Sequence, residues 1–280
     1  MPVAGKRSKL IGRSVKRVTS YHQLGLYVKG FAESHIDLLV ISGGHGLGKS
    51  QTVRRAMAGH KVCWIEGNVT AFGIYERLYR NRDQPIVMDD VDGFTHDRAI
   101  VCLLKSLCQT DKIKEVAWGS QDRFLESLEL PRSFKTKSRL IVITNSWRAL
   151  NRDVSALEDR GHTIHFDPRV DEVHAKAGEW FADQEIYEWF GRNLHRIEKP
   201  SFRNYIRAAQ LKACAMEWRE ILGELPTSSR LALATEILDD PAFEKSEDRA
   251  RAFEARGGGS RRTYFQYRRK ILEAREAAGS

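Results

Sequence analysis

Few folds accommodate the glycine-rich loop that this chain carries between an apolar stretch and a helix-forming one. Residues 36–41 read as a buried strand, and residues 50–58 read as a helix. The glycines between them let backbone N–H groups turn inward, and the helix start adds unpaired donors and a positive dipole end. The loop fits the pattern G-x-x-x-x-G-K-[ST], which predicts a cradle for phosphate groups. Its members are Gly43, Gly44, His45, Gly46, Leu47, Gly48, Lys49 and Ser50.

Four side chains have the chemistry of a nucleoside triphosphate site. Lys49 is placed to reach the β- and γ-phosphates, and the hydroxyl of Ser50 is a ligand for Mg²⁺. Residues 85–90 form a second motif, an apolar strand that ends in two carboxylates. Asp89 is expected near the metal at the carboxyl edge of the sheet, with Asp90 beside it to polarise an attacking water. The sequence therefore predicts ATP and Mg²⁺ as ligands.

Short apolar runs alternate with helix-like segments through the first 168 residues. This alternation predicts an α/β fold, with a parallel sheet covered by helices on both faces. Beyond residue 168, apolar residues recur at helical spacing, and a further helix is expected to begin with Ser201 as its N-cap. Residues 115–137 fit either an inserted hairpin or a loop that faces DNA. The expected strands are 36–41, 62–65, 86–88, 140–144 and 163–166, and the expected helices are 50–58, 72–80 and 98–108.

These motifs together resemble the AAA+ ATPase superfamily of P-loop NTPases. Residues 140–145, Leu-Ile-Val-Ile-Thr-Asn, are similar to the strand that ends in the polar sensor-1 residue of that superfamily. The resemblance implies that Asn145 hydrogen-bonds the γ-phosphate or the attacking water. It also implies that a helical lid follows the nucleotide-binding core.

Two arginines extend the resemblance. Arg160 is similar to the arginine that comes just before the last core strand, which implies a finger that reaches into the site of a neighbouring subunit. Arg148 and Arg152 are rival candidates for this role. Arg203 lies in the segment Pro-Ser-Phe-Arg-Asn-Tyr, which resembles the sensor-2 motif of the lid. The resemblance thus implies a ring or helical homo-oligomer with ATP sites between subunits.

The second motif departs from that of many AAA+ unfoldases, whose strand ends in Asp-Glu. Here the strand ends in Asp89 and Asp90, a pattern similar to bacterial replication initiators, helicase loaders and transposition ATPases. The shorter second acid stands further from the attacking water. The resemblance therefore implies slow ATP hydrolysis that a partner stimulates.

The resemblance divides the chain into four expected regions. A basic N-terminal segment, 1–35, precedes the AAA+ nucleotide-binding core, 36–168. A helical lid, 169–225, is followed by a basic, helix-turn-helix-like C-terminal element, 226–280.

Positive charge is concentrated at the two ends of the chain. The formal net charge is +9, residues 1–20 contain six Lys or Arg and no acid, and residues 256–280 contain seven Lys or Arg and two Glu. Basic terminal blocks suit a polyanion such as nucleic acid, or else they are solvated tails. DNA is the expected partner through these termini.

The C-terminal element resembles a helix-turn-helix reader with a long, glycine-rich turn. Residues 246–255 are expected to form a short helix, and Ser260 is expected to cap a basic, aromatic helix. An apolar stripe that includes Tyr264 and Ile271 leaves four arginines for phosphates or base edges, unless the helix packs on the lid. These arginines are Arg261, Arg262, Arg268 and Arg269.

Two other roles remain open for such an ATPase. A protein remodeller would thread a client through a ring with an aromatic–glycine loop, and residues 71–73 stand near that place, although Phe72 suits the start of a helix. A nucleotide switch in signalling or anti-phage defence would act on protein partners instead.

Composition excludes several other classes. No stretch approaches the ~18 apolar residues of a membrane span, and no apolar signal opens the chain, so a cytoplasmic protein without membrane contact is expected. The cysteines form no CxxC pair, which argues against a zinc cluster or a disulfide framework. Reduced, buried thiols are expected at Cys63, Cys102, Cys108 and Cys214.

Overall fold

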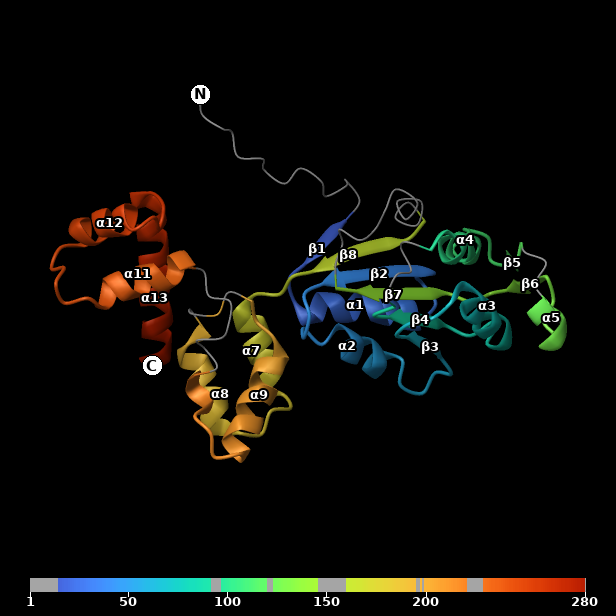
Figure 1. The fold of residues 1–280 in the computed structure, drawn as a ribbon, viewed down its shortest axis with the longest axis horizontal. Coiled ribbons are helices and arrows are strands. Elements are labelled where there is room, and N and C mark those ends of the chain that lie inside the picture. The colour runs from blue at the N-terminus through green and yellow to red at the C-terminus, as the bar shows by residue number, and fades with distance from the viewer. Residues whose placement is uncertain are drawn as a thin grey trace, which may run out of the picture. The chain divides into compact units, whose positions relative to one another are not determined.

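A six-stranded parallel sheet forms the centre of the first part of the chain (Figure 1). The computed structural model describes residues 15–91, 97–119, 123–145, 160–194, 197, 199–220 and 229–279. The chain divides into two compact units, Met1–Asp167 and Pro168–Ser280. The strands of the sheet, in the order β1-β8-β2-β7-β4-β3, are β1 (Lys16–Val18), β8 (His162–Phe166), β2 (Leu38–Gly43), β7 (Leu140–Thr144), β4 (Ile86–Asp89) and β3 (Cys63–Glu66).

Helices alternate with these strands as the sequence predicts. Every strand pair in the sheet is parallel, so the predicted α/β fold class is confirmed. The apolar runs located five of the six strands to within two residues, because all five are buried on at least one face. The helices of this unit are α1 (Tyr21–Ala32), α2 (Lys49–Ala56), α3 (Ala71–Arg80), α4 (Arg98–Leu107) and α5 (Arg123–Ser127).

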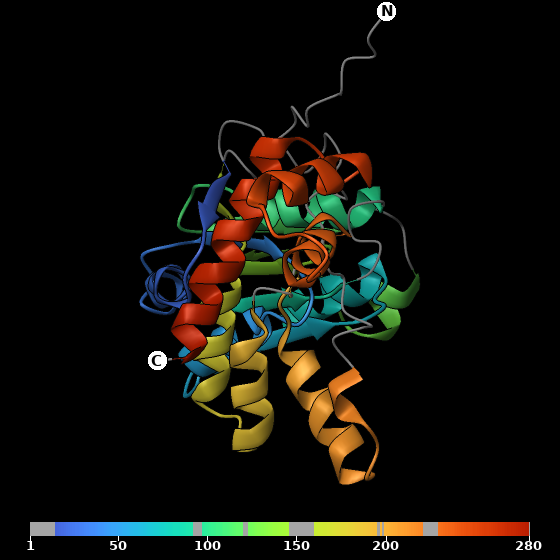
Figure 2. The ribbon, with the colours of Figure 1, turned by 90° about the vertical axis from the view of Figure 1, so that its left-hand side faces the viewer.

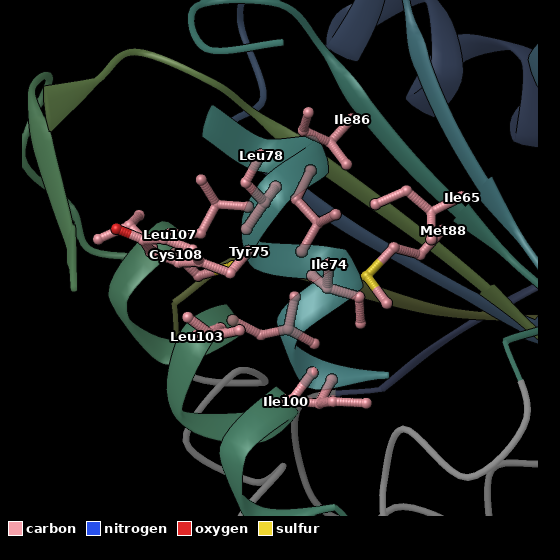
Figure 3. Packing of buried hydrophobic residues seen from close by; sticks show 14 of the residues in the cluster. Ile65, Ile74, Tyr75, Leu78, Ile86, Met88, Ile100, Leu103, Leu107 and Cys108 are labelled. Atoms are coloured by element: carbon pink, nitrogen blue, oxygen red, sulfur yellow. The ribbon is translucent and has the colours of Figure 1, made fainter. Parts of the chain in front are cut away.

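Helices α3 and α4 cover one face of the sheet (Figure 3). Ile65 and Met88 point from their strands toward Ile74 on α3 and Ile100 on α4, and all four are buried. Side chains alternate between the faces of a strand, so Leu39 and its neighbours of the same parity point to the opposite face. On that side α1 contacts both β2 and α2. The sheet is therefore buried on both faces, as its near-continuous apolar strands require.

The segment expected as a basic N-terminal region, 1–35, contains two elements of this unit in its described part. Strand β1 adds to the sheet edge, with Lys16 opposite Ile164 of β8. The Ser20 hydroxyl then caps α1 by accepting a hydrogen bond from the Gln23 backbone N–H at 3.2 Å. Helix α1 buries one stripe of apolar side chains, Leu24, Val28 and Phe31.

An antiparallel pair follows α4. Strands β5 (Lys114–Ala117) and β6 (Ser133–Thr136) pair with each other and flank α5, so the segment 115–137 contains an inserted hairpin. Aromatic packing anchors it: the Tyr75 hydroxyl donates to the Pro131 carbonyl at 2.6 Å, and Phe72 meets Trp118 edge to face at 5.5 Å. Phe72 thus lies within α3 and packs on the hairpin.

The second unit contains two helical clusters. One joins α7 (Val170–Gly178), α8 (Gln184–Arg192), α9 (Phe202–Ala213) and the 3₁₀ turn η3 (Trp218–Glu220). The predicted N-cap of α9 is confirmed, because the Ser201 hydroxyl accepts from the Arg203 N–H at 3.2 Å. Trp180 is 40 % exposed and lies at the edge of the cluster, where its ring contacts Phe181 and Phe202.

The other cluster is formed by α11 (Ser229–Asp239), α12 (Ser246–Ala255) and α13 (Arg261–Gly279), drawn in orange and red in Figure 2. The predicted helix 246–255 and the Ser260 cap of the following helix are confirmed. Tyr264 and Ile271 are fully buried, as the apolar stripe predicts.

The thiols differ from expectation in part. All four cysteines are free, and Cys63 and Cys108 are buried, but Cys102 and Cys214 are exposed, so the expectation of burial was wrong for these two. Cys102 lies on the solvent-exposed side of α4, and Cys214 is the C-cap residue of α9. Their exposure depends on which side of each helix is covered by the rest of the fold. Among the helices of the described residues, none has the length and apolarity to pass through a bilayer.

Strand β2 ends where only glycine fits. Gly43 is paired with Phe166 of β8 and has φ +155°. A Cβ atom on Gly43 would stand 2.3 Å from the Phe166 carbonyl oxygen, well inside van der Waals contact with rigid backbone. The close approach of β8 therefore fixes the residue with which the loop begins.

We predict that Gly43→Ala destabilises the fold by about 2 kcal/mol or more, because backbone must shift to admit the methyl group. Gly25→Ala is the matched control: its Cβ would meet nothing within 4 Å in the interior of α1, so a gain of roughly 0.5–1 kcal/mol is expected. Urea unfolding of both variants checks the signs, and an unchanged midpoint for Gly43→Ala would contradict the packing described.

Candidate active site

The glycine-rich loop joins β2 to α2 in the conformation that its glycines allow. Gly46 and Gly48 have φ values of +70° and +71°, in the left-handed region that other residues disfavour, and Gly48 is the N-cap of α2. His45 is exposed, whereas Leu47 is buried and points into the protein. The backbone of the loop and the N-terminus of α2 therefore face the same place, as a phosphate site requires.

Tyr21 supports the loop from behind. Its hydroxyl donates to the Leu47 carbonyl at 3.0 Å, and its ring packs edge to face on Phe166 at 5.1 Å. Tyr21 is not among the predicted site residues, because it lies in the region interpreted as a basic segment. Its position directly after the capping residue Ser20 is the local signal that could have placed it in a helix.

Lys49 is held inside the loop. Only 5 % of the residue is exposed, and its Nζ donates to the Gly43 and Gly44 carbonyls at 2.9 and 2.7 Å and to Asn145 Oδ1 at 3.0 Å. A buried ammonium needs such acceptors. Phosphate oxygens would offer charged acceptors to the same donor.

Asn145 links two strand ends. It follows β7, and its Nδ2 donates to the carboxylate of Asp90, which follows β4. The predicted residues Lys49, Asn145 and Asp90 therefore form one continuous chain of hydrogen bonds. Asp90 has φ +48°, an uncommon conformation for a residue other than glycine, and such strain is often found at functional sites.

Ser50 and Asp89 form a second contact beside the first. The Ser50 hydroxyl donates to Asp89 Oδ1 at 2.9 Å. Burial is the main cause that raises the pKa of Asp89; the charges of Asp90 and Glu66 raise it further, while the Ser50 hydrogen bond and Arg54 lower it. Glu66 is the register partner of Asp89 on β3.

This donor set fits Mg²⁺. A hydroxyl and a carboxylate are the hard oxygen ligands that this ion takes, together with phosphate oxygens and water. A divalent cation would also relieve the repulsion among the Asp89, Asp90 and Glu66 carboxylates. No group of three or more His, Cys, Asp or Glu side chains within the described part of the chain forms a separate metal cluster.

Of the two predicted arginines, Arg160 lies at the other edge of the sheet from the loop, and Arg203 belongs to the second unit. Arg160 precedes β8 at the amino edge of the sheet, and its guanidinium donates to the Lys105 carbonyl at the end of α4 at 2.8 Å. The loop is at the carboxyl edge, about 13 Å further along β8. Arg203 is exposed in the first turn of α9, in the second unit. The rival candidates Arg148 and Arg152 lie outside the described residues.

The fold and the loop define a P-loop α/β protein. The sequence is 31 % identical over 241 residues to a 36.7 kDa protein from the nrdC–mobD intergenic region of Enterobacteria phage T4, covering 72 % of this chain and 71 % of the phage protein. The chain belongs to the family of that phage protein. The sequence matches no established family profile.

Two solved structures of low sequence identity match this chain over most of its length. A RuvB mutant from Thermotoga maritima has a TM-score of 0.47 at 13 % identity, covering 91 % of this chain and 88 % of that one. NtrX from Brucella abortus, in complex with ADP, has a TM-score of 0.46 at 16 % identity, covering 90 % of this chain and 68 % of that one.

We predict opposite effects of Asp89→Asn on stability and on metal binding. Because the pKa of Asp89 is raised in the fold, its ionised form costs stability above that pKa, and the cost disappears as the pH falls below the unfolded-state pKa. The neutral variant should therefore be more stable than the wild type in urea at pH 7, and equal to it in acid. Its affinity for Mg²⁺ in the presence of nucleotide should fall at least about tenfold.

Asp111→Asn is the control for this experiment. Asp111 is exposed in the turn before β5, and its substitution should change neither quantity. A variant at Asp89 that is less stable than the wild type at pH 7 would contradict the electrostatic description of the site.

Proposed function

We propose that this protein is a Mg²⁺-dependent ATP hydrolase that oligomerises through its ATP sites and acts on DNA, in replication, helicase loading or mobile-element function. The observation that carries the ATPase assignment is the convergence of Lys49, Asn145 and Asp90 in one hydrogen-bonded chain beside the Ser50–Asp89 pair. These residues come from three separate strand ends and meet at a loop built for phosphate.

Each residue has a definite role in this proposal. The loop N–H groups and the helix start bind the phosphates, and Lys49 exchanges its carbonyl acceptors for phosphate oxygens. Ser50 and Asp89 would hold Mg²⁺, which would neutralise charge on the phosphates. Asn145 orients the carboxylate of Asp90, which accepts a proton from the attacking water. Arg203 is proposed as a further contact to the nucleotide from the lid.

The position of Arg160 supports a role in trans. At the amino edge of the sheet its guanidinium is remote from the loop of its own chain, and the residue is exposed. An arginine that faces outward can complete the site of the next subunit and stabilise the charge that develops on the γ-phosphate. The chain would then act as a ring or helical homo-oligomer.

The basic helix α13 supports DNA as the partner, although part of its charge is neutralised within the unit. Of the four arginines considered for DNA contact, Arg261 pairs with Glu247 and Arg269 pairs with Glu273. Arg262 is exposed, and Arg268 is half-buried.

The alternative is an ATPase that remodels proteins or acts as a nucleotide switch. For the remodeller, the aromatic side chain near the expected threading loop is Phe72. It lies within α3 and packs on Trp118, which favours a structural role. The switch would leave the site chemistry as described and would change only the partner.

We predict that Arg160→Ala binds ATP with unchanged affinity but loses turnover by about 10³-fold or more, because the charge on the transition state loses a trans partner. Lys49→Ala, in contrast, should bind ATP weakly. Mixing the two inactive variants should restore activity, since about a quarter of the sites in a random heterologous assembly would combine an intact Lys49 with an intact Arg160. Arg160→Ala turnover equal to that of the wild type, or no recovery on mixing, would refute the assignment.

We further predict that duplex DNA stimulates ATP turnover by the full-length oligomer and that an unfolded protein does not. Steady-state hydrolysis with each addition checks this, and electron microscopy with a non-hydrolysable nucleotide shows whether rings or spirals form on the duplex. Stimulation by unfolded protein alone would favour the remodeller. No response to either would favour the switch.

A further inference from the structure

The cluster of α11, α12 and α13 buries three hydrogen-bond donors that have no acceptor. They are the Tyr264 hydroxyl, Arg249 Nε and Arg268 Nε, and they make up three of the five such side-chain atoms within the described residues. An unsatisfied buried polar group costs folding free energy, so each one needs an explanation such as an absent ion or water. Three in one small cluster, all capable of donating, call for a shared acceptor.

The three groups lie near one another. Tyr264 and Arg268 are one helical turn apart on α13, and therefore on the same face of that helix. Arg249 comes from α12, which packs against α13. Burial raises the pKa of Tyr264, and the charges of Arg249 and Arg268 oppose this shift, so both guanidinium groups lie within electrostatic reach of the hydroxyl.

Within the part of the chain that the structure describes, Arg249 and Arg268 combine partial burial with the lack of a carboxylate partner, whereas the other unpaired arginines of the cluster, Arg230 and Arg262, are exposed. Five other arginines of the cluster have a carboxylate partner, whereas Arg249 and Arg268 have none among the described residues. Both are half-buried, so an anion in solution can reach part of each side chain. The paired arginines are Arg251 with Asp248, Arg256 with Glu236, Arg261 with Glu247, Arg269 with Glu273 and Arg275 with Asp239.

From this arrangement we propose that Arg249, Tyr264 and Arg268 form a binding site for one phosphate group of a nucleic-acid backbone. Two guanidinium groups and a hydroxyl supply donors and positive charge with no acceptor, which a phosphate oxygen would satisfy. The long arginine side chains turn toward the phosphate and open the hydroxyl to it. Exposed Arg262 and Lys270 on the same helix extend positive charge to the neighbouring backbone, which favours a polymer over a free ion.

This inference rests on the proposed action on DNA and makes it specific. It assigns the contact that positions the DNA backbone to the half-buried Arg249 on α12 and Arg268 on α13. Two of the more exposed arginines of α13 are instead paired with glutamates. It also assigns a ligand-binding role to Tyr264, a buried residue that would otherwise be interpreted only as part of the hydrophobic core.

The test measures binding of a fluorescein-labelled 20-base-pair duplex to the full chain by anisotropy over a range of salt concentrations. Arg249→Met and Arg268→Met should each weaken binding about five- to tenfold at low salt. Because the two arginines share one phosphate, the double variant should lower the slope of log K against log salt by about one. Tyr264→Phe removes only the hydroxyl, so it should weaken binding several-fold and leave the slope unchanged.

Arg251→Met is the matched control, because Arg251 stands two residues from Arg249 on α12, is highly exposed and has only a 3.9 Å ion pair. It should bind the duplex like the wild type. Urea unfolding of each variant verifies the fold; Tyr264→Phe should be at least as stable as the wild type, because its hydroxyl makes no hydrogen bond to lose.

The outcomes separate this site from the proposed function. Variants at Tyr264 and Arg268 that bind the duplex like Arg251→Met would overturn the site. Titration of inorganic phosphate identifies the source: saturation at the same residues without duplex binding by the wild type would assign a free anion and overturn the nucleic-acid ligand. Duplex binding that depends on the three residues, in a protein that hydrolyses no ATP, would uphold the site and reject the ATPase proposal alone.

Discussion

The central position of β2 in the sheet governs the geometry of the candidate active site. Strand β2 pairs in parallel with β7 on one side and with β8 on the other, and all six of its residues are buried. Parallel pairing brings the carboxyl ends of β2, β7 and β4 to the same edge, where Gly43, Asn145 and Asp90 stand. The chain can leave β2 toward the phosphate loop only because Gly43 has no Cβ to meet the Phe166 carbonyl. The packing of β8 on β2 and the start of the phosphate loop thus both depend on the absence of a side chain at Gly43.

The two units stabilise their charged groups in different ways. At the loop, the ammonium of Lys49 is buried but fully engaged by two carbonyls and Asn145, while three carboxylates crowd nearby. This balance is suited to exchange, because phosphate oxygens and a cation would replace existing contacts rather than fill a gap. In the C-terminal cluster, the buried Nε donors of Arg249 and Arg268 have no acceptor among the described residues. There a ligand would add contacts that the fold itself does not supply.

The accuracy of sequence interpretation varied with the kind of residue pattern. Strands β2, β4 and β7 were located because a strand buried on both faces is apolar throughout. Strands β1, β5 and β6 are short or alternate between buried and exposed residues, and their apolar content falls below what a local pattern can distinguish. Helix α1 was hidden in the same way, since the basic residues before it dominated the interpretation of the segment. The exposure of Cys102 and Cys214 likewise depends on which helix side meets a neighbour.

The residue order alone specified the chemistry of the loop, the two acids at a strand end and the class of sheet, because these depend on backbone sterics and periodicity over about ten residues. Contacts between distant residues needed the folded chain: Tyr21 beneath the loop, Asn145 between Lys49 and Asp90, Arg160 at the far edge and the orphan donors around Tyr264. The reason is that register and packing bring together side chains from strands and helices whose mutual positions no local pattern encodes. The amino-acid sequence determines the chemistry of each side chain, whereas the side chains come together as a site only when the sheet and the helices pack.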